Sequence, residues 1–316
     1  MPGVAGTDDR GTMATGRRPG STALQRRHID VGGVARTYLV APAPGPGAPL
    51  LVALHGLGIT GADVDRFSGL SDRAPAAGFA TVFPDGWMQM WDGDRRYPRR
   101  RHIDDAAFMV ALVDRLVAEG VCRPGPVSLA GVSNGAFFAE RLARYAVLDV
   151  ASVALVSGAA TETGRQGCPR PRQGAAVALF AGTGDRIVPS GGGRIGGRGL
   201  IGMLVARRAR RSGGIGPPVV AGAEAVAGDW AAANGVSGPP AVERVPGPPG
   251  DLPVTCMRWS APQRPPVVLY RIEGGGHDWP GRPPLLPVRL AGRGARHLDA
   301  TGIILTVARQ AQGLGP

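Results

Sequence analysis

Residues 127–148 read VSLAGVSNGAFFAERLARYAVL, and this stretch decides the fold class of the chain. Its beginning is a short apolar run of strand type, and residues 136–148 repeat apolar side chains at helical spacing. Between them lies GVSNG at 131–135, so the sequence predicts a strand, a sharp turn and a helix. A serine at such a turn projects from the sheet edge, and the flanking glycines let strand and helix approach closely. Ser133 is therefore the candidate nucleophile, and the alternative interpretation is a structural turn serine.

Apolar runs and helical segments alternate on both sides of this turn. Strands are predicted at 50–54, 80–83, 151–156, 175–180, 254–259 and 267–272, and helices at 62–77, 104–119, 221–234 and 298–311. The run LLVAL at 50–54 lacks polar alternation, as expected for a strand buried on both faces of a parallel sheet. Residues 28–40, HIDVGGVARTYLV, predict an antiparallel hairpin. The pattern indicates an α/β fold with a mostly parallel central sheet and helices on both faces.

The length of 316 residues fits one domain, because no linker followed by a new hydrophobic pattern interrupts the chain. Residues 1–27 are rich in Gly, Arg, Thr and Pro and are expected to be a disordered tail, which leaves 28–316 as the folded domain. Residues 190–219 are expected to form a Gly/Arg-rich insertion or mobile loop. No apolar segment of a signal peptide follows Arg17 and Arg18, and Met13 is an alternative start.

Composition bears on the partners of the chain. The formal net charge is +12 and the pI is near 11.1, but no lysine is present and arginine supplies the whole positive charge. We expect a solvated arginine-rich surface rather than a nucleic-acid interface. No apolar run approaches the roughly 18 residues of a membrane span, so no membrane partner is expected. The three cysteines lie far apart without a C-x-x-C pair, which argues against a metal cluster and allows at most one disulfide.

A serine nucleophile needs a base, and the base needs a group that holds it. His277 follows the strand predicted at 267–272 across four residues, so it lies just beyond a strand end, where α/β sheets bind ligands. Asp185 occupies the corresponding place after the strand at 175–180. Asp278 competes for the acid role, although neighbouring residues rarely turn their side chains toward each other. The order Ser133, Asp185, His277 is that of α/β-hydrolases.

The oxyanion of a tetrahedral intermediate needs two N–H donors. The backbone N–H of Asn134, directly after the candidate nucleophile, is expected to be one. The loop HGLG at 55–58 follows the buried strand at 50–54, and we expect the backbone N–H of Leu57 to be the other. His55 would then shape this loop rather than bind a metal or act as a base.

Seven phrases together resemble one family. They are LHGLG (54–58), FPDGW (83–87), IDDAAFM (103–109), GVSNGAF (131–137), GTGDRIVP (182–189), W-x-x-x-N-G (230–235) and EGGGHDWPG (273–281). These phrases resemble the polyhydroxybutyrate-depolymerase-like esterases, which include feruloyl and acetylxylan esterases of the same fold. The resemblance covers about residues 28–312 and implies an α/β-hydrolase fold with Ser133, Asp185 and His277 as its triad.

The chain also departs from that family. Members often have a cysteine directly after W-x-x-x-N-G, whereas this chain has Val236, so the corresponding disulfide is absent. Members are frequently secreted, which favours an extracellular location, but no signal segment is visible and the cytoplasm stays open. The segment 190–219 is longer than the usual connection, and its match to G-x-G-x-x-G at 191–196 is interpreted as a glycine-rich loop rather than a dinucleotide site.

We expect an ester hydrolase that works through an acyl-enzyme without metal or cofactor. Oligoesters of the polyhydroxyalkanoate type are the expected substrate, with feruloyl or acetylxylan esters as the alternative. Trp91 and Trp279 are candidates for substrate binding. Arginines 95, 96 and 99–101 could attract carboxylate-bearing oligomers. A serine peptidase of the same fold and a catalytically inactive binding protein are the rival interpretations, and the oligomeric state stays open.

Overall fold

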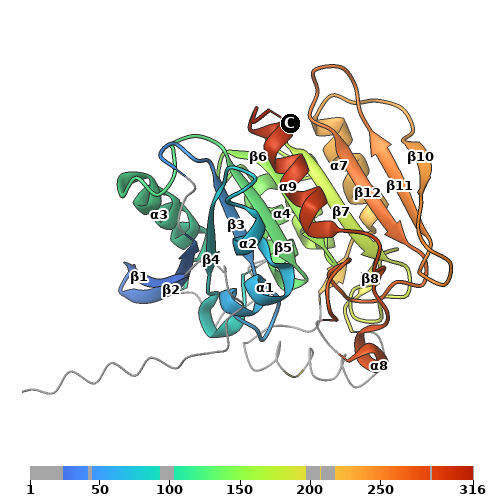
Figure 1. The fold of residues 1–316 in the computed structure, drawn as a ribbon, viewed down its shortest axis with the longest axis horizontal. Helices are drawn as coiled ribbons and strands as arrows, with labels where there is room; N and C mark the ends of the chain where they lie inside the picture. The colour runs from blue at the N-terminus through green and yellow to red at the C-terminus, as the bar shows by residue number, and fades with distance from the viewer. Residues whose placement is uncertain are drawn as a thin grey trace, which may run out of the picture.

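The computed structural model describes residues 24–41, 45–92, 103–196, 207, 218–284 and 287–315, which build a twisted sheet between two layers of helices (Figure 1). The sheet has ten strands in the described chain, in the spatial order β1 (Gln25–Val31), β2 (Val34–Ala41), β4 (Ala80–Pro84), β3 (Leu50–Leu54), β5 (Val127–Val132), β6 (Val150–Val156), β7 (Ala176–Gly182), β12 (Val267–Ile272), β11 (Val254–Trp259) and β10 (Ala241–Val245). The central strands from β4 to β12 run parallel, and the outer strands on both sides are antiparallel. A separate ribbon pairs β8 (Gly193–Arg194) with β9 (Val219–Val220). The predicted α/β architecture and the hairpin at 28–40 are confirmed.

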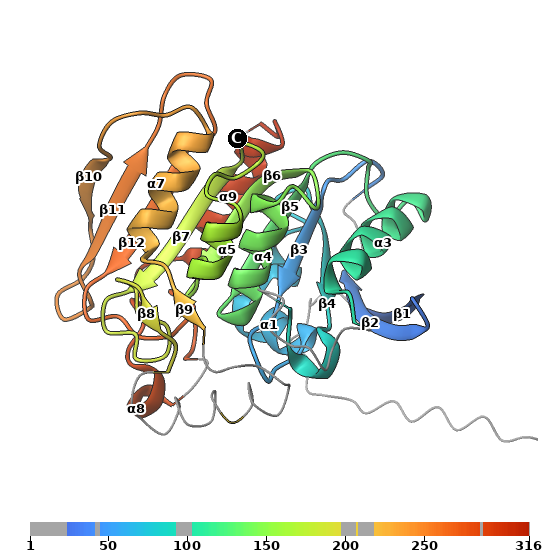
Figure 2. The same ribbon diagram turned by 180° about the vertical axis from the view of Figure 1, so that it is seen from behind.

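Helices cover both faces of the sheet. One face carries α1 (Gly61–Ser68), α2 (Leu70–Arg73) and α9 (Ala300–Ala311), as Figure 1 shows. The other carries α3 (Asp105–Ala118), α4 (Asn134–Arg144), α5 (Glu162–Gly167) and α7 (Ala223–Ala233), seen in Figure 2. Two short elements are the 3-10 helix η1 (Trp87–Gln89) and α8 (Val288–Ala291). The longest helix of the described residues, α3, has 14 residues, and none of the described helices combines the length and hydropathy of a membrane span.

The central strands bury side chains on both faces, which explains their unbroken apolar runs. In β3, Leu50, Val52 and Leu54 join the core beneath α3, α4 and α7. Leu51 and Ala53 of the same strand join the opposite core beneath α1, α2 and α9. Alternate residues of a strand point to opposite faces, so both sets must be apolar when helices cover both.

Several elements differ from the sequence expectation. The helix predicted at 62–77 is divided by Gly69, whose φ of 65° lies in the left-handed region and ends α1. The expected tail 1–27 ends earlier, because β1 begins at Gln25, and residues 1–23 lie outside the described chain. β10 was not predicted, because this edge strand is exposed along almost its whole length and its sequence AVERV shows no buried apolar face. Most of the expected insertion at 190–219 lies outside the described residues, and β8 and β9 stand near its two ends.

The three cysteines are all free and buried in the structure, so no disulfide joins them. Burial raises the pKa of the Cys122 thiol to about 11. A thiol that stays protonated is a poor nucleophile, and Cys122 behaves as a small apolar core residue.

The turn between β5 and α4 depends on two glycines. A Cβ on Gly131 would collide with the carbonyl group of Gly135, and a Cβ on Gly135 would collide with the carbonyl oxygens of Leu54 and His55. The obstructing atoms are backbone, which cannot rotate away. Both positions of the G-x-S-x-G pattern therefore require glycine for packing, whatever the serine does.

Gly131→Ala is expected to lower the free energy of unfolding by about 1–3 kcal/mol, as overpacking of a close-packed site does. Urea unfolding followed by circular dichroism measures it. Gly228→Ala is the matched control, because Gly228 lies inside α7 with no atom near the added methyl group, and the change should stabilise by about 0.5–1 kcal/mol. Equal stability of Gly131→Ala and the wild type would contradict the packing argument.

Candidate active site

Ser133 occupies a strained position at the centre of the sheet. β5 ends at Val132 and α4 begins at Asn134, and Ser133 between them has φ 54° and ψ −118°. A left-handed conformation costs a residue with a side chain about 1–3 kcal/mol, and the surroundings must hold it there. The Ser133 N–H donates to the carbonyl oxygen of Val156 at 2.9 Å. The residue is half-buried.

The structure brings Asp185 and His277 into contact. They follow β7 and β12, which are parallel neighbours in the sheet, so the two turns meet at one edge. His277 Nδ1 lies 2.8 Å from Asp185 Oδ2, and both side chains are almost fully buried. The other carboxylate oxygen of Asp185 accepts the N–H groups of Ile187 and Val188 at 2.8 and 2.9 Å. The carboxylate is thus held from two sides, and Nε2 is the ring nitrogen that this arrangement leaves for proton transfer.

The loop that carries His277 is anchored to the rest of the sheet edge. The His277 N–H donates to the carbonyl oxygen of Ala291 at 2.6 Å. The Ser157 hydroxyl donates to the carbonyl oxygen of Asp278 at 3.0 Å and accepts the Asp278 N–H at 3.2 Å. Ser157 directly follows β6, the strand between those that lead to Ser133 and Asp185, and it also has a left-handed φ of 49°.

Sequence reasoning did not single out Ser157. Its signal was nevertheless present, because the residue follows a predicted strand in the same way that Ser133 does. The next residue, Gly158, packs closely against the serine turn. A Cβ on Gly158 would collide with the carbonyl oxygen of Ser133. The ends of β5, β6, β7 and β12 are therefore joined into one edge that carries the candidate residues.

A second Asp–His pair lies elsewhere in the structure. His297 Nδ1 is 2.8 Å from Asp251 Oδ2, in the segment that leads into α9. Burial alone would raise the pKa of Asp251, but hydrogen bonds from the His297 ring and from backbone N–H groups hold that pKa well below its ordinary value. Neither residue follows a central parallel strand, so this pair lies apart from the candidate site. Its contacts hold the segment before α9. Asp278, the rival acid, has its backbone bonded to Ser157, while the His277 ring bonds Asp185.

The expected oxyanion loop at 55–58 lies against the serine turn. A Cβ on Gly56 would stand 3.5 Å from the Ser133 Cβ, in ordinary contact. The Gly58 N–H donates to the carbonyl oxygen of Gln89 at 2.8 Å, which ties the loop to η1. Leu57 lies between these two anchored glycines. The loop and the first residue of α4 thus approach Ser133 from two sides.

His55 is a buried, neutral support of this loop. The Gly86 N–H donates to its Nε2 at 2.8 Å, so Nε2 carries the lone pair and Nδ1 carries the hydrogen that faces the Gly56 carbonyl oxygen at 2.7 Å. Burial lowers the pKa of His55, and the Gly56 carbonyl and nearby carboxylates oppose this shift only in part. The geometry agrees with the sequence expectation that His55 shapes the loop.

The two tryptophans expected to bind substrate are packing residues in this structure. Trp91 and Trp279 are both 0% exposed. Trp279 donates its indole N–H to Thr301 Oγ1 at 3.0 Å and packs against Phe67. Trp91 stacks on Phe138 and donates its indole N–H to the carbonyl oxygen of His55 at 3.0 Å. Neither ring is open to a substrate, and the sequence pattern could not distinguish a buried loop tryptophan from an exposed one.

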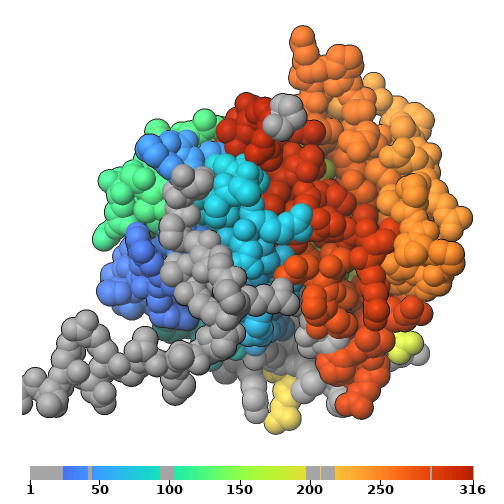
Figure 3. All heavy atoms as spheres, in the orientation of Figure 1, coloured from blue at the N-terminus to red at the C-terminus, as the bar shows by residue number. Residues whose placement is uncertain are grey.

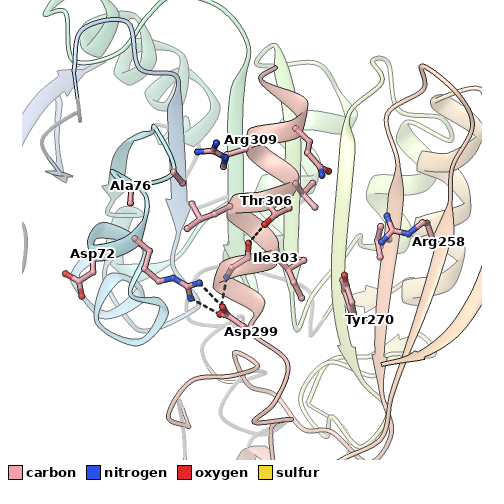
Figure 4. Close-up of a pocket in the computed structure, with 15 residues that line it drawn as sticks. Asp72, Ala76, Arg258, Tyr270, Asp299, Ile303, Thr306 and Arg309 are labelled. Carbon is pink, nitrogen blue, oxygen red and sulfur yellow. Dashed lines mark hydrogen bonds and ion pairs between the residues drawn. The ribbon is translucent and has the colours of Figure 1, made fainter. Parts of the chain in front are cut away.

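A groove of about 790 Å³ runs beside α9 and is lined from α2, α9, β11 and β12 (Figure 4). It opens on the face that Figure 3 shows, where α9 (red) lies between the first helices (cyan) and the later strands (orange). Arg73 spans part of it through two hydrogen bonds of 2.7 Å to Asp299. None of its lining residues belongs to the candidate site at the strand ends.

Other expectations concern residues outside the described chain. The arginines at 95, 96 and 99–101 are among these, so their expected attraction for carboxylates stays a prediction. The segment 191–196 forms a turn and the strand β8, which is paired with β9, in agreement with a glycine-rich loop.

His55 predicts a pH dependence of stability. Its pKa is lowered in the folded chain, so the unfolded chain binds a proton at this residue more readily. The stabilisation is complete above the unfolded pKa of about 6.5 and is lost as the pH falls toward the folded pKa, by up to about 1.4 kcal/mol per pH unit. Urea unfolding between pH 7.5 and 5 should show a shallower loss for His55→Gln than for the wild type. His28→Gln, at an exposed histidine of β1, is the control, and parallel curves for all three proteins would refute the assignment.

Comparison with known proteins supports the architecture. No family model matches the chain. The protein described as "Putative esterase NocK" from Nocardia uniformis subsp. tsuyamanensis is 29% identical over 278 residues, which cover 84% of this chain and 77% of that protein. An acetyl xylan esterase from Aspergillus awamori superposes with a TM-score of 0.54 at 12% identity, covering 80% of this chain and 94% of that one.

A thermostable esterase gives a TM-score of 0.41 at 15% identity and covers 60% of this chain, which spans 52% of that structure's length. The acetyl xylan esterase and this chain share their fold over most of both lengths, and the strand order of the sheet agrees with it. Together they show that this chain has the α/β-hydrolase fold, with a mixed, largely parallel sheet of ten described strands between two layers of helices.

Proposed function

We propose that this chain is a serine carboxylic-ester hydrolase (EC 3.1.1.-) with Ser133 as nucleophile, His277 as base and Asp185 as the acid that holds the base. The observation that carries the proposal is the buried 2.8 Å contact between Asp185 and His277, at the sheet edge that also carries the strained Ser133 turn. A pair of this kind beside a strained serine is the arrangement that nucleophilic acyl transfer requires. The similarity to an esterase in sequence and to an acetyl xylan esterase in fold agrees with it.

The reaction would proceed in two halves. Ser133 Oγ attacks the ester carbonyl carbon while His277 Nε2 takes the hydroxyl proton of Ser133, and a tetrahedral intermediate forms. The intermediate collapses, the C–O bond to the alcohol breaks, and His277 returns the proton to the departing alkoxide. A water molecule then attacks the acyl-enzyme through the same base and releases the carboxylic acid. Asp185 stabilises the imidazolium in both halves, and the N–H groups of Leu57 and Asn134 receive the negative oxygen.

The substrate we propose is an oligoester of the polyhydroxyalkanoate type, as for a polyester depolymerase. The support is the sequence resemblance together with an apolar side chain beside the oxyanion loop: Met88 of η1 is 73% exposed, and η1 is tied to Gly58 through Gln89. Feruloyl or acetylxylan esters are the second candidate, favoured by the superposition on an acetyl xylan esterase. A catalytically inactive binding protein is the candidate of another class.

Ser133→Ala is expected to reduce kcat for p-nitrophenyl esters by roughly 10⁴-fold or more, because the nucleophile itself is lost. His277→Gln should cost a similar factor. His297→Gln is the matched control, since His297 also bonds a carboxylate but lies in the other Asp–His pair, and it should keep wild-type kcat. Full activity in Ser133→Ala, or loss in His297→Gln alone, would overturn the assignment of the triad.

A panel of esters separates the substrate classes. Wild type and Ser133→Ala are assayed with a hydroxybutyrate trimer, methyl ferulate, acetylated xylan and p-nitrophenyl acetate through octanoate. A kcat/KM highest for the trimer supports the oligoester, and one highest for ferulate or acetylxylan replaces it with a cell-wall ester. Neither turnover nor labelling by a fluorophosphonate in the wild type would favour the inactive binding protein.

A further inference from the structure

Trp91 connects the two sides of the expected oxyanion hole. Its backbone is bonded to the side chain of Asn134, and its indole N–H is bonded to the backbone of His55. Asn134 directly follows the candidate nucleophile, and His55 opens the loop that carries Leu57. One buried residue therefore touches both segments whose N–H groups are proposed as donors.

The contact with Asn134 is reciprocal. The Trp91 N–H donates to Asn134 Oδ1 at 2.7 Å, and Asn134 Nδ2 donates to the Trp91 carbonyl oxygen at 3.2 Å. Two opposed hydrogen bonds to one amide fix both its position and its orientation. The side chain of Asn134 thus fastens the first residue of α4, and with it the N–H that follows Ser133.

The contact with the loop acts through His55. The indole N–H of Trp91 reaches the His55 carbonyl oxygen at 3.0 Å, and the two rings lie 5.0 Å apart. His55 is also held by Gly86 and by its own contact with the Gly56 carbonyl group. These contacts therefore hold the peptide group between His55 and Gly56, which leads to Leu57.

Trp91 itself is firmly held. Its ring stacks on Phe138 of α4 with centroids 5.0 Å apart and planes 6° from parallel. The next residue, Asp92, donates its N–H to Asp105 Oδ2 at 2.8 Å, and Asp105 Oδ1 pairs with the buried Arg36 at 2.7 Å. Asp105 thus accepts the Asp92 N–H and pairs with Arg36 at the same time. Arg36 lies on β2 and Asp105 begins α3, so two elements of the scaffold hold the far end of this segment.

We infer that Trp91 is a positioning residue that sets the spacing between the N–H groups of Leu57 and Asn134 by bonding both segments at once. The inference rests on the proposed ester hydrolysis. Donors must lie about 2.7–3.1 Å from the place where the oxyanion develops. A small displacement of either segment therefore weakens binding of the transition state more than binding of the substrate. Trp91 would act through these groups and would not touch the substrate.

The test removes one hydrogen bond and keeps the rest. Trp91→Phe retains an aromatic ring against Phe138 and the backbone bonds to Asn134, but it loses the donor to the His55 carbonyl group. We expect kcat for p-nitrophenyl butyrate to fall about 10–100-fold with KM changed less than about twofold. The inhibition constant of an aliphatic trifluoromethyl ketone, whose hemiketal oxygen occupies the hole, should rise by the same factor as kcat falls.

Trp230→Phe is the matched control. Trp230 is likewise 0% exposed, but it lies on α7, which packs against β7 and β12. Both substitutions shorten a buried aromatic side chain and should lower thermal stability, while kcat and the inhibition constant should change in Trp91→Phe alone. An equal loss of activity in both variants, or a rise of KM without a fall of kcat in Trp91→Phe, would overturn the positioning role.

A double-mutant cycle tests whether Trp91 joins the two segments. Asn134→Ala removes the side-chain amide but leaves the backbone N–H of residue 134 in place. If Trp91 and Asn134 act together, the fold-loss of kcat in the double variant should be clearly smaller than the product of the fold-losses in the two single variants. Losses that simply multiply would mean that the segments are held independently.

Wild-type protein without hydrolysis or fluorophosphonate labelling would refute the proposed function, whereas an active wild type with an equally active Trp91→Phe would refute this inference alone.

Discussion

The left-handed conformation of Ser133 is the constraint on which the rest of the site depends. It requires β5 to stop and α4 to start with a single residue between them, which brings the backbone of 131 against that of 135. The helix in turn presses against the end of β3, where a side chain at 135 would collide. The strain is therefore balanced by the packing of a buried strand, a helix and the next strand, and it places the hydroxyl group at the edge of the sheet.

Parallel pairing of the neighbouring strands converts this single turn into a site. β6, β7 and β12 follow β5 in spatial order, and each ends at the same edge. Ser157 follows the first, Asp185 the second and His277 the third after a glycine-rich turn. These residues are up to 144 positions apart in the sequence. They lie close together because the parallel strands before them are neighbours in the sheet and end at the same edge. Asp185 bonds the imidazole ring of His277, and Ser157 bonds the backbone of the next residue, Asp278. Both the side chain of His277 and the adjoining backbone are therefore held.

Two histidine environments illustrate how burial and partners decide chemical character. His55 is fully buried, accepts one N–H and faces one carbonyl oxygen, so it stays neutral and serves as a support. His297 has a carboxylate partner at the same 2.8 Å as His277 but lies outside the row of parallel strand ends. The contact with a carboxylate therefore does not distinguish His277 from His297. His277 differs in its place at the edge that carries the serine turn, and for this reason we propose His277 as the base.

The fold class and the proposed triad could be predicted from the sequence alone, because both predictions use local patterns. Apolar runs, glycines around Ser133, and residues that directly follow predicted strands are visible in the order of side chains. Other features became visible only in the folded chain. Gly69 divided one predicted helix, an edge strand without an apolar pattern appeared as β10, and Trp91 and Trp279 proved buried. It also connected Trp91 with both Asn134 and His55, and Arg36 with Asp105. Such contacts join residues 36 to 69 positions apart, and their existence depends on how layers pack, which no local pattern encodes.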